Sequence, residues 1–266
     1  MDEQRVLLLG ASQVRYSDSG PADSVLGLLE SHLARLRPDI AWRCENRPLH
    51  YGARMPEFAL RAIDEVKPSA VVLGFVIGPF TWPNPMGRIR RRWPRVYRLA
   101  RNSAEFLKKL AGGGNVSSPR GLIFRAPRQL LAWTIGAEPE VDADAAMDST
   151  VATLDALARR EDVAIVCGLT LFPAAQESRR TTNYATVQDR FRELVKDGCR
   201  RHHFGLYDRI DQAARLGHAI GYGINKDYAD LPTRRQDAES LAALIVAGLE
   251  FEASAPAATT HPVVAR

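Results

Sequence analysis

Residues 5–10 read RVLLLG and residues 70–77 read AVVLGFVI, and these two apolar runs decide the fold class of the chain. A short continuous run of this kind is typical of a strand that is buried on both faces of a parallel sheet. Between them, residues 23–37 carry Val and Leu at helical spacing, which predicts an amphipathic helix. Strands and helices that alternate in this way predict βαβ units with right-handed crossovers, and therefore an α/β fold.

The same alternation continues along the chain. We expect further strands at 40–44, 163–167 and 204–207, and further helices at 57–66, 143–159, 187–200, 209–216 and 238–249. The sequence therefore predicts one three-layer α/β domain with a parallel sheet over residues 1–252. Residues 253–266 are rich in proline and small side chains, and we expect them to form a disordered tail.

A long basic insertion interrupts the pattern after the third strand, over residues 79–141. It contains two predicted helices, at about 95–110 and 129–135. Between residues 86 and 136 there are twelve Lys and Arg residues and one acidic residue, Glu105, which gives this segment a net charge of +11. Because the whole chain has a net charge of +5, the rest of it carries −6, and the basic character is local.

Three explanations of this insertion remain open. It could close over a ligand as a lid that brings arginines to an anionic substrate, or it could dock on a partner protein. It could also lie on an anionic membrane surface as an amphipathic element, which we expect less than the first two. A nucleic-acid role is expected least, because no recognised nucleic-acid-binding motif accompanies the charge.

Composition and motifs narrow the remaining classes of function. Cys44, Cys167 and Cys199 are widely spaced and odd in number, which favours a reducing cytoplasm over a disulfide framework or a zinc site. The sequence has no leader pattern and no apolar stretch long enough to cross a bilayer. Since it also has no Walker motif, dinucleotide fingerprint or metal-ligand cluster, we expect a cytoplasmic protein without cofactor or metal.

In parallel α/β sheets, ligands bind in the crevice beyond the carboxyl ends of the strands. Here those ends lead into loops at 10–13, 46–54, 75–80, 170–177 and 227–233. We refer to this edge of the sheet as the crevice, and we expect the functional residues there.

The loops at the crevice resemble four motifs of the SGNH (GDSL-like) hydrolases. Gly10-Ala11-Ser12 resembles the block that carries the nucleophilic serine, and the segment 46–52 resembles the block whose glycine, here Gly52, donates a backbone N–H to the oxyanion. The segment 71–77 lies where the family has Gly-x-Asn, and Asp230–Thr233 has the spacing of its final Asp-x-x-His. The resemblance implies a flavodoxin-like SGNH-hydrolase fold with Ser12 and Asp230 in the catalytic site.

Two residues depart from the family pattern. Val76 stands where the resemblance implies the oxyanion-hole asparagine, and Thr233 stands where it implies the catalytic histidine. A serine hydroxyl is a weak nucleophile without an adjacent base, and threonine is no base near neutral pH. Loss of one oxyanion donor typically lowers turnover by about 10²–10³. Ordinary ester hydrolysis is therefore expected to be severely impaired.

The remaining candidates at the crevice suit binding of an anion. We expect His50, Gly52, Arg15, Thr233 and Arg234 to contact the ligand, because guanidinium groups recognise carboxylate, phosphate or sulfate. Backbone amides near Ser12 would favour the same kind of group. The alternative for the arginines is that they only pair with nearby carboxylates, which are Asp18, Asp227, Asp230 and Asp237.

Three functions follow, and whether the chain is an enzyme stays open at this point. The first is an SGNH-like protein repurposed away from ester hydrolysis, which binds a small anionic or acyl-derived metabolite as an atypical enzyme or as an accessory subunit of one. The second is an active serine esterase or deacylase in which another group, such as His50, replaces the missing base. The third is a non-catalytic module that binds a partner protein or an anionic membrane through the basic insertion.

Overall fold

The computed structural model describes residues 3–10, 20–81, 88–89, 92–95, 139, 141–171, 184–221 and 229–254. Its centre is a five-stranded sheet in the order β2-β1-β3-β4-β5, and every neighbouring pair is parallel. The strands are β1 (Glu3–Gly10), β2 (Ala41–Pro48), β3 (Ala70–Phe75), β4 (Ala164–Leu169) and β5 (Gly205–Asp208). The predicted parallel α/β fold is confirmed.

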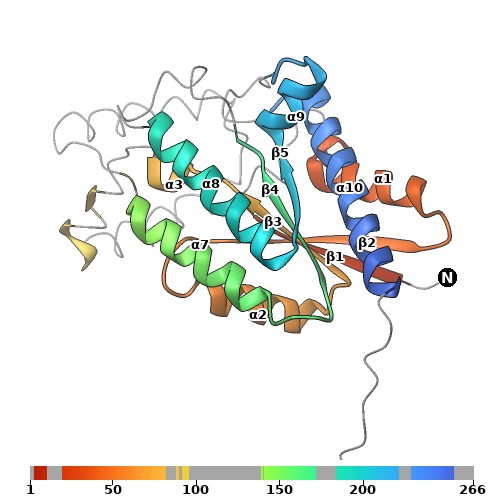
Figure 1. Ribbon diagram of the computed structural model, residues 1–266, viewed down its shortest axis with the longest axis horizontal. Coiled ribbons are helices and arrows are strands. Elements are labelled where there is room, and N and C mark those ends of the chain that lie inside the picture. Colours follow the sequence, from red (N-terminus) through yellow and green to blue (C-terminus); the bar gives the residue numbers. More distant parts are fainter. Residues whose placement is uncertain are drawn as a thin grey trace, which may run out of the picture.

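Helices cover both faces of the sheet and give the three layers (Figure 1). The helices α1 (Val25–Leu36) and α10 (Leu231–Ser254) pack on one face, and α2 (Met55–Val66), α7 (Ala143–Leu157) and α8 (Tyr184–His202) pack on the other. Short elements complete the described chain: η2 (Pro21–Asp23), α3 (Gly78–Thr81) and α9 (Arg209–Leu216).

Alternate side chains of the strands build two separate cores. Leu7 of β1 and Val71 of β3 face α2, α7 and α8, whereas Val6 and Val72 of the same strands face α1 and α10. All four side chains are buried. Burial on both faces is the physical reason that these strands are continuously apolar in sequence.

Polar caps fix where the helices begin. The Ser24 hydroxyl accepts a hydrogen bond from the Gly27 N–H at the start of α1, and the Asp142 carboxylate accepts one from the Asp144 N–H at the start of α7. Asp208 caps α9 in the same way. Such caps satisfy amides that have no partner within the helix.

The structure corrects three of the predicted boundaries. The second strand continues to Pro48, so residues 46–48 belong to β2 rather than to a loop. The last helix begins at Leu231 instead of residue 238, because Asp230 caps it and a proline at its second position is tolerated. It ends at Ser254, so the first two residues of the predicted tail are helical. The predicted helices at about 95–110 and 129–135 lie, apart from residue 95, outside the described residues.

Candidate functional site

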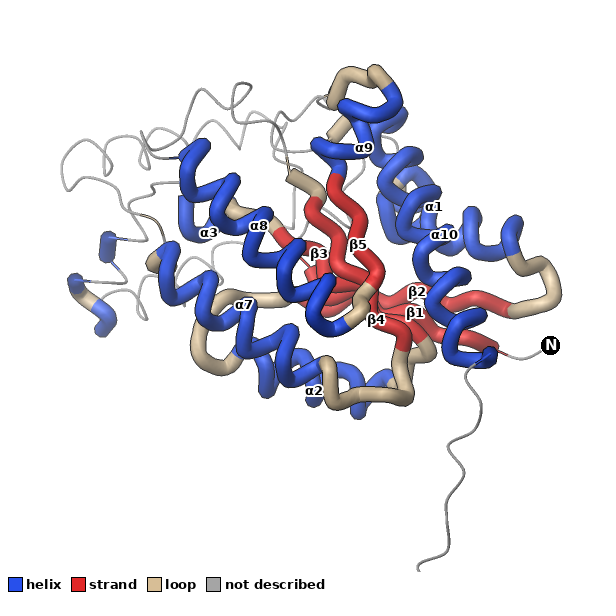
Figure 2. Tube along the Cα trace, viewed as in Figure 1, coloured by secondary structure: helices blue, strands red, loops and turns tan. Residues whose placement is uncertain are grey.

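The carboxyl ends of all five strands lie at the same edge of the sheet, as their parallel pairing requires (Figure 2). β1 ends there at Gly10 and β3 at Phe75, and β5 ends there at Asp208. Ser12 and Arg15, which follow β1, lie outside the described residues. The other predicted site residues are described, and they lie after β2 and at the start of α10.

The loop after β2 holds His50 and Gly52. The His50 side chain is exposed. Gly52 has a φ of 141°, and its N–H donates a hydrogen bond of 3.3 Å to the hydroxyl of Ser149 on α7. That hydroxyl in turn donates to the Ala146 carbonyl at 2.9 Å. The amide that the resemblance assigns to an oxyanion hole therefore already has an acceptor within the protein.

Tyr51 fixes the end of β3 at the position of the expected asparagine. Its hydroxyl donates to the Val76 carbonyl at 2.7 Å and accepts from the Val76 N–H at 3.3 Å. Its ring lies edge-on to Phe80, with 5.1 Å between the ring centroids. Burial raises the pKa of Tyr51, against the effect of the hydrogen bond to Val76. Both polar groups of the Val76 backbone are thus held by a neutral phenol.

Asp230 and Thr233 are joined to each other and to Gly221. The Asp230 carboxylate accepts a hydrogen bond from the Thr233 N–H at 3.0 Å and so caps α10. The Thr233 hydroxyl accepts one from the Gly221 N–H at 3.0 Å, and the Asp230 N–H donates to the Gly221 carbonyl at 3.1 Å. A Cβ at position 221 would collide with the Asp230 carboxylate, so this arrangement needs glycine. Thr233 itself is buried.

Arg234 lies in the first turn of α10, one residue after Thr233, and its side chain is buried. The neighbouring Arg235 is exposed. The predicted loop at 227–233 is wrong from residue 231 on, because Leu231 to Thr233 belong to α10. A helix directs successive side chains about 100° apart, so one arginine turns inward and the other outward.

A buried ion pair that the sequence analysis did not predict lies near the same edge. Arg209 follows β5, and its guanidinium donates to both carboxylate oxygens of Asp237 on α10, at 2.9 and 2.5 Å. A third nitrogen of Arg209 donates to the Thr170 carbonyl just after β4, at 2.9 Å. The Tyr207 hydroxyl donates to Asp237 at 2.6 Å. This group joins α10 to the carboxyl ends of β4 and β5.

The environment of this ion pair shifts two pKa values. Burial alone would lower the pKa of Arg209, but the Asp237 carboxylate outweighs it and the pKa is raised. Burial and the nearby Asp237 carboxylate both raise the pKa of Tyr207. Arg209 is therefore held in its charged form beside a neutral phenol, which suits a structural role of the pair.

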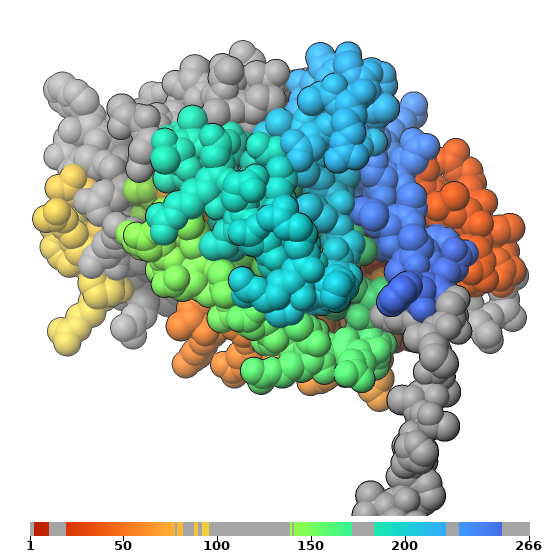
Figure 3. Space-filling model, viewed as in Figure 1, coloured from red at the N-terminus to blue at the C-terminus, as the bar shows by residue number. Residues whose placement is uncertain are grey.

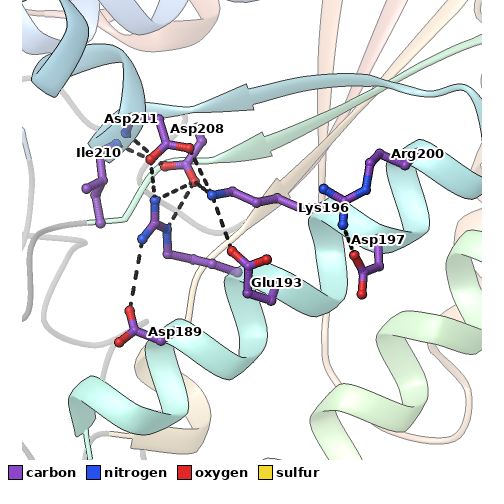
Figure 4. A network of polar contacts seen from close by, with 9 residues as sticks. Asp189, Glu193, Lys196, Asp197, Arg200, Asp208, Ile210 and Asp211 are labelled. Atoms are coloured by element: carbon purple, nitrogen blue, oxygen red, sulfur yellow. Dashed lines mark hydrogen bonds and ion pairs between the residues drawn. The ribbon is translucent and has the colours of Figure 1, made fainter.

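A second ionic network fixes the carboxyl end of β5 from the other side (Figure 4). Arg192 and Lys196 of α8 bind Asp208 and Asp211, with nitrogen–oxygen distances of 2.8 Å from Arg192 to each carboxylate and 2.9 Å from Lys196 to Asp211. Asp208 also accepts from the Ile210 N–H at 3.0 Å. Asp208, the last residue of β5, thus binds α8, and the next residue, Arg209, binds α10.

Two further features lie away from the crevice. His202 is hydrogen-bonded to Asp155 of α7 at 2.7 Å, and its ring packs against Phe204. A cavity of about 210 Å³ lies at the amino ends of β1 and β2, lined by Gln4, Arg37, Ile40, Trp42, Val246, Leu249 and Glu250.

Within the described ranges, His, Cys, Asp and Glu side chains form no group of three or more that could hold a metal ion. No helix in this part of the chain is long and apolar enough to span a membrane.

Sequence reasoning missed Tyr51, Ser149, Gly221 and the Arg209–Asp237 pair. Tyr51 could have been predicted, because it lies between His50 and Gly52 in a loop of the crevice. The pairing of Arg209 with Asp237 could not, since 28 residues separate them and many other acidic and basic residues could have paired.

Neither a protein-family model nor a curated protein matches the sequence of this chain. Its fold is similar to solved structures of esterases and lipolytic proteins. A mutant of the acetyl-xylooligosaccharide esterase Axe2 from Geobacillus stearothermophilus superposes with a TM-score of 0.53 at 10% identity, over 92% of this chain and 95% of that chain. For the esterase EstA from Pseudoalteromonas sp. the TM-score is 0.51 at 8% identity, over 93% and 99%. A member of the lipolytic G-D-S-L family from Veillonella parvula gives 0.51 at 9% identity, over 91% and 98%.

Proposed function

We propose that this chain, which has the fold of the SGNH/GDSL esterases, does not hydrolyse esters by the serine mechanism of that fold. Its crevice instead binds a small anionic or acyl-derived metabolite, and the protein acts as an atypical enzyme or as an accessory subunit of one. The observation that carries this proposal is the hydrogen bond from the Gly221 N–H to the Thr233 hydroxyl. Thr233, at the position of the catalytic base, takes part in the hydrogen bonds that join Gly221 and Asp230 to the start of α10.

The chemistry of the serine mechanism explains why this matters. The Ser12 hydroxyl would need a group that takes its proton as it attacks an ester carbonyl. Thr233 has no basic atom for that role. Asp230, which would orient such a base, uses its carboxylate to cap α10. The two residues therefore have structural partners that account for their presence.

The expected oxyanion donors support the same proposal. The Gly52 N–H donates to Ser149, and Val76 has no polar side chain to offer. An ester carbonyl entering the crevice would have to displace the Ser149 hydroxyl to bind the Gly52 amide. Since oxyanion donors act by being preorganised toward the developing charge, this arrangement opposes acyl transfer.

The proposal of an anionic ligand is supported by Ser12 and by the arginines that closely follow two of the predicted crevice loops in the sequence. Arg15 follows Ser12 by three residues, and Arg234 and Arg235 lie near the start of α10. A guanidinium at such a crevice binds carboxylate or phosphate, which is the head group of many acyl-derived metabolites.

Ester hydrolysis measured with p-nitrophenyl acetate and butyrate tests the first half of the proposal. We expect the wild type and Ser12→Ala to give the same slow rate.

The second candidate function is a serine esterase that uses His50, which is exposed and two residues before Gly52. Turnover by the wild type that disappears in both Ser12→Ala and His50→Ala would establish that alternative and overturn the proposal.

Thermal unfolding in the presence of phosphate, acetate, butyrate and butyryl phosphate tests the second half. We expect at least one of these anions to raise the Tm, and we expect Arg15→Gln to reduce the shift. Arg43→Gln is the matched control, because Arg43 is an exposed arginine of β2 outside the crevice. The same Tm shift in both variants, or no shift with any anion, would count against a crevice that binds anions.

A further inference from the structure

The described part of the basic insertion presents an exposed tryptophan among exposed neighbours. Trp93 is 48% exposed, and Arg92, Pro94 and Arg95 are exposed as well. Ile89, one helical turn before Trp93, is buried and its carbonyl accepts the Trp93 N–H at 2.8 Å. The segment therefore buries Ile89 and leaves its aromatic and cationic side chains exposed.

The position of this segment brings it near the functional edge of the sheet. In Figures 1 and 3 the yellow segments of residues 88–89 and 92–95 lie at the outer left edge of the molecule, beyond the start of α7. They lie on the same side as α3, which follows the carboxyl end of β3. A surface that Trp93 touches would therefore lie on the side of the molecule to which the crevice belongs.

The positive charge of the segment around Trp93 indicates what kind of partner it binds. The segment 86–136 carries +11, whereas the rest of the chain carries −6 from a total of +5. Protein–protein interfaces are enriched in arginine and tryptophan, but their centres are otherwise depleted of charge, so a net charge of +11 in one segment suits a polyanionic surface better. A polyanionic surface attracts the basic segment and repels the acidic remainder, which orients the whole molecule.

Two polyanionic surfaces could attract the basic segment, an anionic bilayer and a nucleic acid. The exposed ring of Trp93 favours the bilayer. Tryptophan is enriched at the head-group level of bilayers, where its ring is buried and its N–H stays hydrated. Arginines beside it bind the lipid phosphates. Duplex DNA offers phosphates as well, but it offers an isolated tryptophan no comparable apolar layer.

We propose that Arg92, Trp93 and Arg95 form a contact site for an anionic lipid surface, with Trp93 at the level of the head groups and the two arginines on lipid phosphates. The contact places the crevice side of the protein next to the membrane. This proposal does not depend on what the crevice does, and a failure of either one leaves the other standing.

Co-sedimentation of the full chain with vesicles tests the proposal. The vesicles are pure phosphatidylcholine in one arm and contain 30% phosphatidylglycerol, by design, in the other. We expect binding only to the anionic vesicles, and we expect 0.5 M NaCl to weaken it. Each basic residue near a membrane surface strengthens binding about fivefold, so Arg92→Gln/Arg95→Gln should weaken it more than tenfold. Trp93→Ala alone should weaken it severalfold.

Leu36 provides the matched control. It is 50% exposed and lies between Arg35 and Arg37 at the end of α1, outside the insertion. The variant Arg35→Gln/Leu36→Ala/Arg37→Gln also removes two arginines and one exposed apolar side chain, and it should bind the vesicles like wild type. Circular dichroism melts should show that all variants fold.

Three outcomes would overturn the proposal. The first is equal binding of the wild type to both kinds of vesicle or to neither. The second is an equal loss of binding in the Leu36 control. The third is binding to a duplex DNA probe that depends on Arg92 and Arg95 but not on Trp93, without any vesicle binding, which would assign the surface to nucleic acid.

Discussion

The Thr233 hydroxyl accepts the Gly221 N–H at 3.0 Å, and through this bond the segment before α10 is joined to the first turn of that helix. Together with the bond from the Asp230 N–H to the Gly221 carbonyl, it holds Gly221 by both of its backbone polar groups. Residue 233 therefore has a structural role that does not involve proton transfer.

The first prediction concerns Thr233→Val, which keeps the shape of the side chain and removes the acceptor. The partly buried Gly221 amide then lacks a partner, so we expect a loss of about 1–2 kcal/mol in the free energy of unfolding measured with urea. Thr153→Val is the control, because the Thr153 hydroxyl donates to the Ser149 carbonyl, which the helix already satisfies. Equal stability of the two variants would show that the Thr233 bond contributes nothing.

The second prediction concerns the buried pair of Arg209 and Asp237. Asp237→Asn leaves the Arg209 charge buried without its counter-ion, and we expect a loss of about 3–5 kcal/mol in urea unfolding. Asp39→Asn removes the carboxylate from the exposed pair with Arg37 and should leave the free energy of unfolding close to that of the wild type. A small effect of Asp237→Asn would mean that Arg209 finds another acceptor.

The third prediction is a pH dependence that arises from Asp211. Partial burial would raise its pKa, but Lys196 and Arg192 outweigh burial and hold the pKa below its ordinary value. A carboxylate with a lowered pKa stabilises the folded state above the unfolded pKa of about 3.9, and this contribution is lost as pH falls through the folded pKa. We expect Asp211→Asn to flatten the fall in stability below about pH 4.

Urea unfolding at a series of pH values from neutral to acidic measures this effect. At neutral pH the variant should be less stable than wild type, and the two curves should converge as the solution becomes acidic. A constant difference at every pH would show that the ionic network does not depend on the charge of Asp211.

The fourth prediction concerns Gly52 and its φ of 141°. A methyl group at position 52 or at Gly217 would meet no atom within 4 Å, so substitution by alanine tests the backbone alone. Gly217 has a φ of 65°, close to the values of 51° and 57° that Lys67 and His203 adopt in this protein. We expect Gly52→Ala to cost about 1–3 kcal/mol, and more than Gly217→Ala does. Differential scanning calorimetry of both variants checks the order.

Much of the fold could be predicted from particular residues. The apolar runs at 5–10 and 70–77 predict buried parallel strands because only a strand covered on both faces needs to be apolar throughout. The second of these strands ends two residues earlier than predicted, at Phe75. The predicted helix at 209–216 agrees with α9 at both ends, where Asp208 and Gly217 provide a cap and a left-handed stop. The predicted start of the last helix, residue 238, was wrong because Pro232 and two arginines obscure the apolar periodicity of the first turns of α10. The helix begins at Leu231, directly after its cap Asp230.

The sequence by itself determined the layered α/β fold and the absence of a histidine and an asparagine from the two aligned positions. Each of these depends on local periodicity or on the identity of a residue at a known place in a motif. Only the tertiary structure decided which partners these positions have. Ser149 binds the Gly52 amide, Gly221 binds Thr233, and Arg209 binds Asp237. Such contacts join segments far apart in the chain, and packing of the layers, rather than spacing in sequence, selects them.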